Sequence, residues 1–362
     1  MRKLFEDFYN RYFDDEESVI LLILLLSGLG VLLLLGNVIA PLITAIIIAY
    51  LMQGLVNLLL QYRLPKWLAF GLVYTVFIGL FTVLLVYLIP RAWDQLQRLM
   101  IELPNLLTQW QQSLMALPEN YPTLFSQQQI EDFIDSIRSE VAAYGQRVLE
   151  YSLASIYSVI TWIVFLVLVP ILVFFMMRDK DELVRWSQNF LPRNRPLMSR
   201  IWREMDQQIA NYVRGKFVEI LIVGSVSYIM FSLLGLNYSL LLSVLVGLSV
   251  IVPYIGATVA TIPVAVVAYV QWGIGGEFAT VLIAYGILQL LDGNVLVPVI
   301  FSEAVNLHPV AIIAAVLVFG GWWGLAGVFF AIPLATLIKA IINSWPSRVQ
   351  TREAESEQAA SG

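Results

Sequence analysis

Long runs without a charged residue dominate the chain and alternate with shorter polar stretches. A helix of about 20 apolar residues crosses the hydrocarbon core of a bilayer, so most of these runs are long enough to span a membrane. Leu21 to Leu26 and Val244 to Val252 show no alternation between neighbouring residues, which excludes transmembrane strands and predicts helices. Asp, Glu, Lys and Arg are absent from 18–62, 67–90, 151–177, 220–276, 278–291 and 304–338.

The first half of the chain predicts four spans. Its first charge-free run is too long for one helix and contains Gly36, Asn37 and Pro41, which predict a turn between two helices. The later runs each fit one span, and Pro170 predicts a kink in the last of them. The predicted helices are 18–36, 40–60 and 67–89, which form a three-span segment over 18–90, and a fourth span over 151–177.

The polar stretches predict the orientation. The basic stretch from Arg178 to Lys216 is expected in the cytoplasm, because loops rich in Lys and Arg remain on that side. Its charge is explained either by topology together with an amphipathic helix on the membrane surface, or by a specific lipid or partner site. The resulting organisation has cytoplasmic tails at 1–17 and 341–362, a periplasmic helical insert at 91–150 and a basic, amphipathic cytoplasmic segment at 178–216.

Composition narrows the class of protein. Hydrophobic residues make up 59% of the 362 and charged residues 13%, about half of the roughly 25% charge of a soluble domain. The net charge of -5 argues against a nucleic-acid partner. With no cysteine, one histidine and no phosphate-binding loop or H-E-x-x-H motif, the sequence predicts no cofactor, no metal and no enzyme activity. The fold class is therefore an all-α polytopic membrane protein, and transport is the remaining activity.

Residues 217–340 form the predicted transport core, because two hydrophobic segments there are too short for ordinary spans. Ser239 to Val252 stops at a Pro-Tyr-Ile-Gly sequence, and Val310 to Phe319 stops at a Gly-Gly-Trp-Trp-Gly sequence. Paired interruptions of this kind indicate broken helices at a transporter's binding site. Two re-entrant hairpins fit this pattern, and so do ordinary kinked spans joined by short turns.

Asp292 is the leading candidate for the substrate or ion pathway, because a carboxylate inside an apolar run normally faces a protein or water-filled interior. The alternative is a solvated or helix-capping carboxylate. Glu219 is either a second pathway residue or an interfacial one, and His308 either a pathway residue or a loop residue. The glycines, Pro253 and Tyr254 at the interruptions either expose backbone to a solute or form tight turns. The candidates are Asp292, Glu219, Asn294, Gln289, Pro253, Tyr254, Gly256, Gly320, Gly321, Gly324 and His308.

Several of these motifs resemble the PerM-type permeases of the autoinducer-2 exporter (AI-2E) family. The similar stretches run from Asn237 to Gly256, from Leu291 to Pro298, from Ser302 to Pro309 and from Phe319 to Ala335. The resemblance implies a multi-pass protein of the bacterial inner membrane, with about eight hydrophobic segments, a periplasmic insert and a homo-oligomeric assembly. Members of the family are described as exporters of autoinducer-2 and as sodium/proton exchangers.

The expected function is an inner-membrane permease, a secondary transporter or exporter of a small polar solute coupled to H⁺ or Na⁺. Its expected partners are the lipid bilayer, the solute or ion, and further copies of the chain. Two alternatives remain open: a passive channel, or a membrane scaffold or receptor that does not transport and acts through the 91–150 insert.

Overall fold

The computed structural model describes residues 16–102, 128, 132, 136, 139, 156–192, 195–253, 255–301 and 307–344. Most of the predicted tails and of the 91–150 insert, together with Tyr254, lie outside the described residues. Every regular element in the described part is a helix, which confirms the all-α class. The elements are α2 (Glu16–Gln61), α3 (Lys66–Val83), η1 (Leu84–Leu88), α6 (Ile156–Arg178), α7 (Lys180–Gln188), α8 (Pro196–Leu233), α9 (Ser239–Ser249), α10 (Ile255–Trp272), α11 (Gly276–Leu291), η2 (Asp292–Leu296), α12 (Val297–Phe301) and α13 (Pro309–Ser344).

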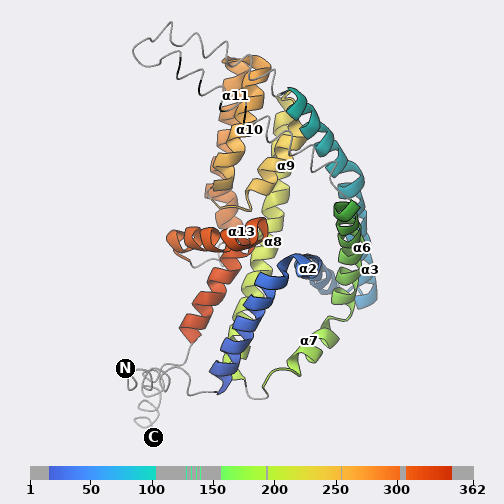
Figure 1. Ribbon diagram of the computed structural model, residues 1–362. Coiled ribbons are helices and arrows are strands. Elements are labelled where there is room, and N and C mark those ends of the chain that lie inside the picture. The colour runs from blue at the N-terminus through green and yellow to red at the C-terminus, as the bar shows by residue number, and fades with distance from the viewer. Residues whose placement is uncertain are drawn as a thin grey trace, which may run out of the picture.

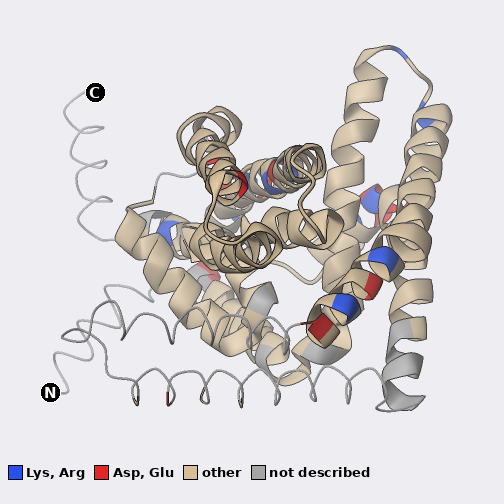
Figure 2. Ribbon diagram, turned by 90° about the horizontal axis from the view of Figure 1, so that it is seen from above, with Lys and Arg blue, Asp and Glu red and all other residues tan. Residues whose placement is uncertain are grey.

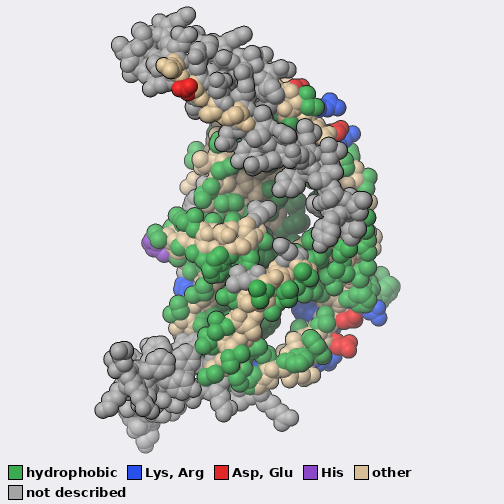
Figure 3. All heavy atoms as spheres, viewed as in Figure 1, with side chains coloured by type: hydrophobic (Ala, Val, Ile, Leu, Met, Phe, Trp, Pro, Cys, Tyr) green, Lys and Arg blue, Asp and Glu red, His purple; other side chains and the backbone are tan. Residues whose placement is uncertain are grey.

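Charged residues are sparse on these helices when the molecule is seen from above (Figure 2). Apolar side chains cover much of the described surface between its two ends (Figure 3), as expected for a protein surrounded by lipid. Five helices of the described part are long and apolar enough to cross a bilayer, and the multi-pass prediction is confirmed to that extent. Their bounds are Val38–Gln61, Lys66–Glu102, Pro196–Leu233, Ile255–Trp272 and Gly276–Phe301.

Three helices are longer than the sequence pattern predicted. In place of separate helices at 18–36 and 40–60, α2 is one helix of 46 residues that passes through Pro41, and its ribbon changes direction along its length (Figure 1). The helix that starts as α3 continues to Glu102, past the predicted boundary at 91. Likewise, α8 runs without interruption through the predicted boundary at 216. Neighbouring helices can stabilise a proline or a polar residue within a helix. A proline or a change to polar sequence therefore does not necessarily end a helix here.

Two groups of helices surround α8, which runs through the centre of the molecule (Figure 1). The later part of α2 packs with α3 and α6 around Val169 and Val173. On the other side, α9, α10 and α11 pack against the second half of α8 around Phe231 and Leu242. The beginning of α2, at Leu21, and the end of α13, at Ala340, pack against the first turns of α8.

The first interruption is a helical hairpin made by α9 and α10. Gln271 ties its open ends together, since its Nε2 donates to Gly235 O at 2.7 Å and its Oε1 accepts from Asn237 N at 2.8 Å. The 11 residues of α9 are about 16 Å long, well short of the roughly 30 Å hydrocarbon core. By length alone, α9 is therefore too short to span the bilayer, whereas α10, the other arm, is long enough.

Gly256 allows the two arms of this hairpin to meet. A Cβ at this position would lie 1.7 Å from the carbonyl oxygen of Ser249, closer than any real Cβ contact. We therefore expect Gly256→Ala to lower the stability by about 1–3 kcal/mol, as overpacking does. Thermal unfolding of the purified protein measures this loss, and Gly71→Ala is the matched control because a Cβ at Gly71 meets nothing within 4 Å. Equal melting temperatures for the two variants would contradict this account of the turn.

The helix that continues from α3 to Glu102 contacts the entrance of the same hairpin. Gln95 Oε1 accepts from Leu241 N at 2.8 Å, which satisfies a free N–H group in the first turn of α9. The hydroxyl of Tyr238 donates to Glu102 Oε2 at 2.5 Å. Burial and this contact with Glu102 raise the pKa of Tyr238 to about 12, so its phenol stays protonated at neutral pH.

Tyr238→Phe is expected to lower the melting temperature slightly, because a hydrogen bond of this kind contributes about 0.5–1.5 kcal/mol. The raised pKa of Tyr238 means that this stabilisation is complete below pH 10 and is lost as the pH rises through about 12. Melting curves of the wild type and the variant should therefore differ by a constant amount between pH 6 and 9. A difference that vanishes within this range would contradict the assignment.

Candidate functional site

A buried ion pair on α8 lies at the tip of the α9–α10 hairpin. Lys216 Nζ lies 2.7 Å from Glu219 Oε2 and also donates to the carbonyl oxygen of Val250 at 2.8 Å. The relative exposure is 5% for Lys216 and 2% for Glu219. Removing two charges from water costs several kcal/mol per ion, so a buried pair needs this close geometry to persist. Lys216 thus connects the ion pair directly to the hairpin tip.

The ion pair arises from the spacing of polar residues along α8. Tyr212, Lys216 and Glu219 follow one another at four and three residues and are all buried, so they share one face of the helix. The ammonium of Lys216 also lies 5.4 Å from the ring centroid of Phe301, within the range of a cation–π contact. Further along α8, Gly224 and Gly247 of α9 pack closely, because a Cβ on Gly247 would lie 3.0 Å from Gly224 Cα.

Asp292 lies near this ion pair on the opposite helix, beyond the 4.0 Å salt-bridge distance from Lys216. It is the first residue of η2, a π-helical turn, and such turns are frequent at functional sites. The charges of Lys216 and Asp292 interact, as do those of Glu219 and Asp292. Asp292 is half-buried, and its Oδ1 is buried without a hydrogen-bond partner. Lys216, Glu219 and Asp292 together form what we call the polar centre.

The packing of α8 against α11 and α12 explains this meeting. Near one end of the interface, the rings of Phe231 and Tyr285 lie 6.3 Å apart. Near the other end, a Cβ on Gly215 would lie 2.7 Å from the side chains of Ile300 and Phe301. The segment α11–α12 therefore runs antiparallel to α8. Along the interface, Glu219 and Asp292 each lie between these two contacts.

The second interruption is a tight reversal inside α13. Gly324 has φ 58° and ψ -136°, a conformation that glycine adopts without strain. On the two arms, a Cβ on Gly327 would lie 1.8 Å from Phe319 O, and one on Gly320 would lie 2.8 Å from the side chain of Val328. Gly321 has open space around it and is exposed. The tight-turn explanation thus accounts for Gly320 and Gly324.

The two interruptions meet. Val252, from the tip of the first hairpin, packs into the cluster formed by Phe319 and Trp323 beside the second reversal. Pro253 is half-buried next to this contact, and Trp323 Nε1 is buried without a hydrogen-bond partner. The contact places the two hairpins side by side at their tips.

Two of the residues predicted from the sequence, His308 and Asn294, make only local hydrogen bonds and do not contact the polar centre. His308 is exposed before the start of α13, and its Nδ1 accepts from Val310 N at 3.3 Å, which is the role of a capping residue. Asn294 is exposed, and its Nδ2 donates to Leu290 O at 2.9 Å within its own helix.

Sequence reasoning missed Lys216 and Gly327. Lys216 was grouped with the basic cytoplasmic segment, although its position three residues before Glu219 was a signal for an ion pair on one helix face. Gly327 follows Gly324 by three residues, and only the folded hairpin shows its contact with Phe319.

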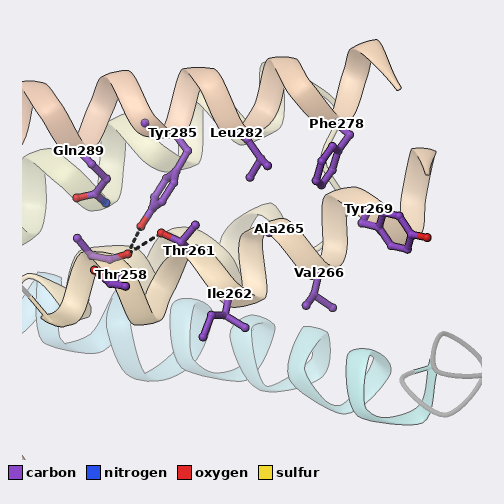
Figure 4. A pocket seen from close by; sticks show the side chains of 12 residues that line it. Thr258, Thr261, Ile262, Ala265, Val266, Tyr269, Phe278, Leu282, Tyr285 and Gln289 are labelled. Carbon is purple, nitrogen blue, oxygen red and sulfur yellow. Dashed lines mark hydrogen bonds between the residues drawn. The ribbon is translucent and has the colours of Figure 1, made fainter. Parts of the chain in front are cut away.

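A groove of about 790 Å³ runs between α10 and α11 and ends beside the polar centre. The hydroxyl of Tyr285 donates to Ala257 O at 3.0 Å across this groove, and Thr261 donates to the same oxygen at 2.8 Å (Figure 4). Gln289 lines the end of the groove one helical turn before Asp292, and its Nε2 is buried without a partner. The groove therefore offers both apolar walls and unused hydrogen-bonding groups, as small-molecule sites do.

The described residues contain no group of three or more His, Cys, Asp or Glu side chains that could hold a metal ion. The polar centre has only two carboxylates, and one of their oxygens already accepts from Lys216.

Comparisons with known proteins place the chain among membrane transport proteins. The sequence model of the protein family described as "AI-2E family transporter" matches residues 21–347. The chain is 45% identical to the "Putative permease PerM" of Escherichia coli K12 over 96% of its length and 98% of that protein. It is 26% identical to the "Putative transport protein YueF" of Bacillus subtilis 168, over 83% of the chain and 82% of that protein.

A further relative is the "AI-2 transport protein TqsA" of Escherichia coli K12, which is 26% identical over 88% of the chain and 90% of that protein. The matches span both halves of the molecule, including α8, both hairpins and η2. The chain belongs to the AI-2E family of membrane transporters.

Proposed function

We propose that this protein is a secondary transporter that couples the movement of a small polar solute to a proton gradient across the bacterial inner membrane, with the polar centre as its coupling site. The observation that carries the proposal is the buried, unpartnered Oδ1 of Asp292 beside the Lys216–Glu219 pair. The name of TqsA suggests a solute such as autoinducer-2.

The balance of charge supports a coupling role. Lys216 neutralises one carboxylate, which leaves one negative charge when both Glu219 and Asp292 are ionised. A single carboxylate inside the bilayer costs about 2.5–3.5 kcal/mol on insertion scales. Binding one proton at Asp292 removes this cost, whereas Na⁺ requires several oxygen ligands, and both Val250 O and Glu219 Oε2 are already engaged by Lys216. A proton is therefore the better fit.

Lys216 offers a way to convert the charge of Asp292 into movement. Its ammonium has three donors and here binds Glu219 and the hairpin carbonyl of Val250. When Asp292 loses its proton, it becomes a competing acceptor for Lys216. A shift of Lys216 toward Asp292 would release Val250 O and free the tip of the first hairpin, and Val252 transmits this change to the second.

The groove between α10 and α11 is the proposed path for the solute. It borders the polar centre at Gln289, and movement of the α9–α10 hairpin changes one of its walls. Gln289, Tyr285 and Thr258 supply hydrogen-bonding groups along it. A small polar solute in this groove would therefore affect, and respond to, the charge at Asp292.

The test starts by comparing metabolites inside and outside cells that lack or overproduce the protein. Solutes that change in opposite directions are then assayed in proteoliposomes containing the full-length protein. We expect saturable flux that follows an imposed pH gradient. Single-channel currents would indicate a passive channel. Absence of flux, together with loss of the cellular phenotype on deletion of residues 103–150, would indicate the scaffold alternative.

A further inference from the structure

A second cavity, which none of the polar-centre residues lines, lies between α2, α7 and the first half of α8. This α7 groove has a volume of about 800 Å³, which is within the range of about 300–1,000 Å³ typical of small-molecule sites. On the face seen in Figure 3, the molecule is hollowed between α7 and the neighbouring helices. The proposed function does not use this cavity.

The walls of the α7 groove are suited to a hydrocarbon chain. Apolar side chains from three helices line it, among them Leu25 and Ala49 of α2, Met198 and Ile201 of α8, and Met176 of α6. Burial of apolar surface is worth about 25 cal/mol per Å². An acyl chain is the molecule of matching shape that a bilayer supplies at high concentration.

The charged side chains that line the α7 groove are all positive, whereas the carboxylates of Asp206 and Glu17 bond to lining residues from behind. Lys180, Arg195 and Arg203 line it, and none of its lining residues is Asp or Glu. Arg195 donates to Gln188 O and Arg203 Nε donates to Ser199 O, so each guanidinium keeps further donors free. Within the part of the chain that the structure describes, no carboxylate lies within salt-bridge distance of these three cations. Such a set of donors is complementary to a phosphate group.

The side chains around the α7 groove indicate that it lies at the level of the lipid headgroups. On α7 itself, Leu183 and Trp186 are exposed next to charged residues, the pattern of a helix that lies in the membrane interface. Phe190 packs edge-on against Trp186, with ring centroids 4.9 Å apart, and Trp202 is exposed on α8. Exposed tryptophans are enriched at this level of the bilayer.

We propose that the α7 groove binds an anionic phospholipid, with its acyl chain between α2 and α8 and its phosphate against Lys180, Arg195 and Arg203. The apolar walls select a lipid over a free phosphate, and the three cations select an anionic headgroup over a zwitterionic one. The bound lipid would connect α7 to α2 and α8.

The test uses native mass spectrometry of the full-length protein in detergent, titrated separately with phosphatidylglycerol, phosphatidylcholine and inorganic phosphate. Lys180→Gln/Arg203→Gln removes two groove cations. Arg185→Gln/Arg200→Gln is the matched control, since it removes the same charge from the same segment outside the groove. We expect the first variant to lose about 30-fold in affinity for phosphatidylglycerol and the control to bind like the wild type. Thermal unfolding checks that both variants are folded.

Equal affinity of the wild type for phosphatidylglycerol and phosphatidylcholine would overturn the proposal. So would equal losses in the two double variants, which would indicate general attraction to the basic segment. Inorganic phosphate that displaces phosphatidylglycerol at equal concentration would show that the site recognises only the anion. The supporting result is a mass spectrum in which phosphatidylglycerol stays bound to the protein under conditions that remove phosphatidylcholine and phosphate.

Discussion

Asp292→Asn is expected to abolish solute accumulation driven by a pH gradient while leaving solute exchange in place. Asparagine keeps the size and polarity of the side chain but cannot bind and release a proton. Because Oδ1 of Asp292 has no hydrogen-bond partner, the substitution breaks no contact of that atom. The measurement is uptake into proteoliposomes with an imposed pH gradient, compared with exchange of labelled for unlabelled solute without a gradient. We expect accumulation to fall at least tenfold and exchange to change by less than threefold, about the effect of 0.6 kcal/mol.

Asn294→Ala is the matched control for Asp292→Asn. It changes a polar residue two positions away that is exposed and bonds only to Leu290 O within its helix. We expect Asn294→Ala to accumulate solute like the wild type. If Asp292→Asn retained full gradient-driven accumulation, proton coupling at this residue would be excluded.

Lys216→Met is expected to have the largest effect on stability of any single substitution in the polar centre. It removes the partner of Glu219, whose relative exposure is 2%, and leaves a buried carboxylate. Removing one partner of a buried pair typically costs 3–5 kcal/mol, about the effect we expect here. It also leaves Val250 O without its donor at the hairpin tip. Thermal unfolding in detergent should show a marked decrease in melting temperature.

The double variant Lys216→Met/Glu219→Leu separates charge from packing. Apolar residues of similar volume often replace a buried ion pair at no net cost, so the double variant should recover most of the lost stability. It should nevertheless fail to couple solute movement to protons, because Lys216 can no longer move between acceptors. Lys216→Met as stable as the wild type, or a double variant less stable than Lys216→Met, would contradict the ion pair's structural role.

The sequence predicted the helical class and the location of the interruptions because both depend on local signals. Long charge-free runs must form helices in a bilayer, and Gly324 adopts a positive φ that few other residues tolerate. The family resemblance agreed with these signals and is confirmed by the matched residues 21–347. The site residues themselves remain proposals.

Local signals failed where tertiary packing decides. Pro41 predicted a break, but α2 passes through it because neighbouring helices can support a proline in an apolar segment. Lys216 looked like one of nine cytoplasmic cations, and only the packing of α9 and α12 against α8 shows that it is buried. The partner of Glu219 therefore could not be assigned from charge counting alone.

The central claim is that the polar centre couples solute movement to protons. The most direct measurement records the internal pH of proteoliposomes with a trapped fluorescent dye, in Na⁺-free buffer, while a solute gradient is imposed across wild-type protein. The account predicts proton movement that saturates with solute concentration and is absent with Asp292→Asn. Saturable solute flux through the wild type without any change of internal pH would contradict it.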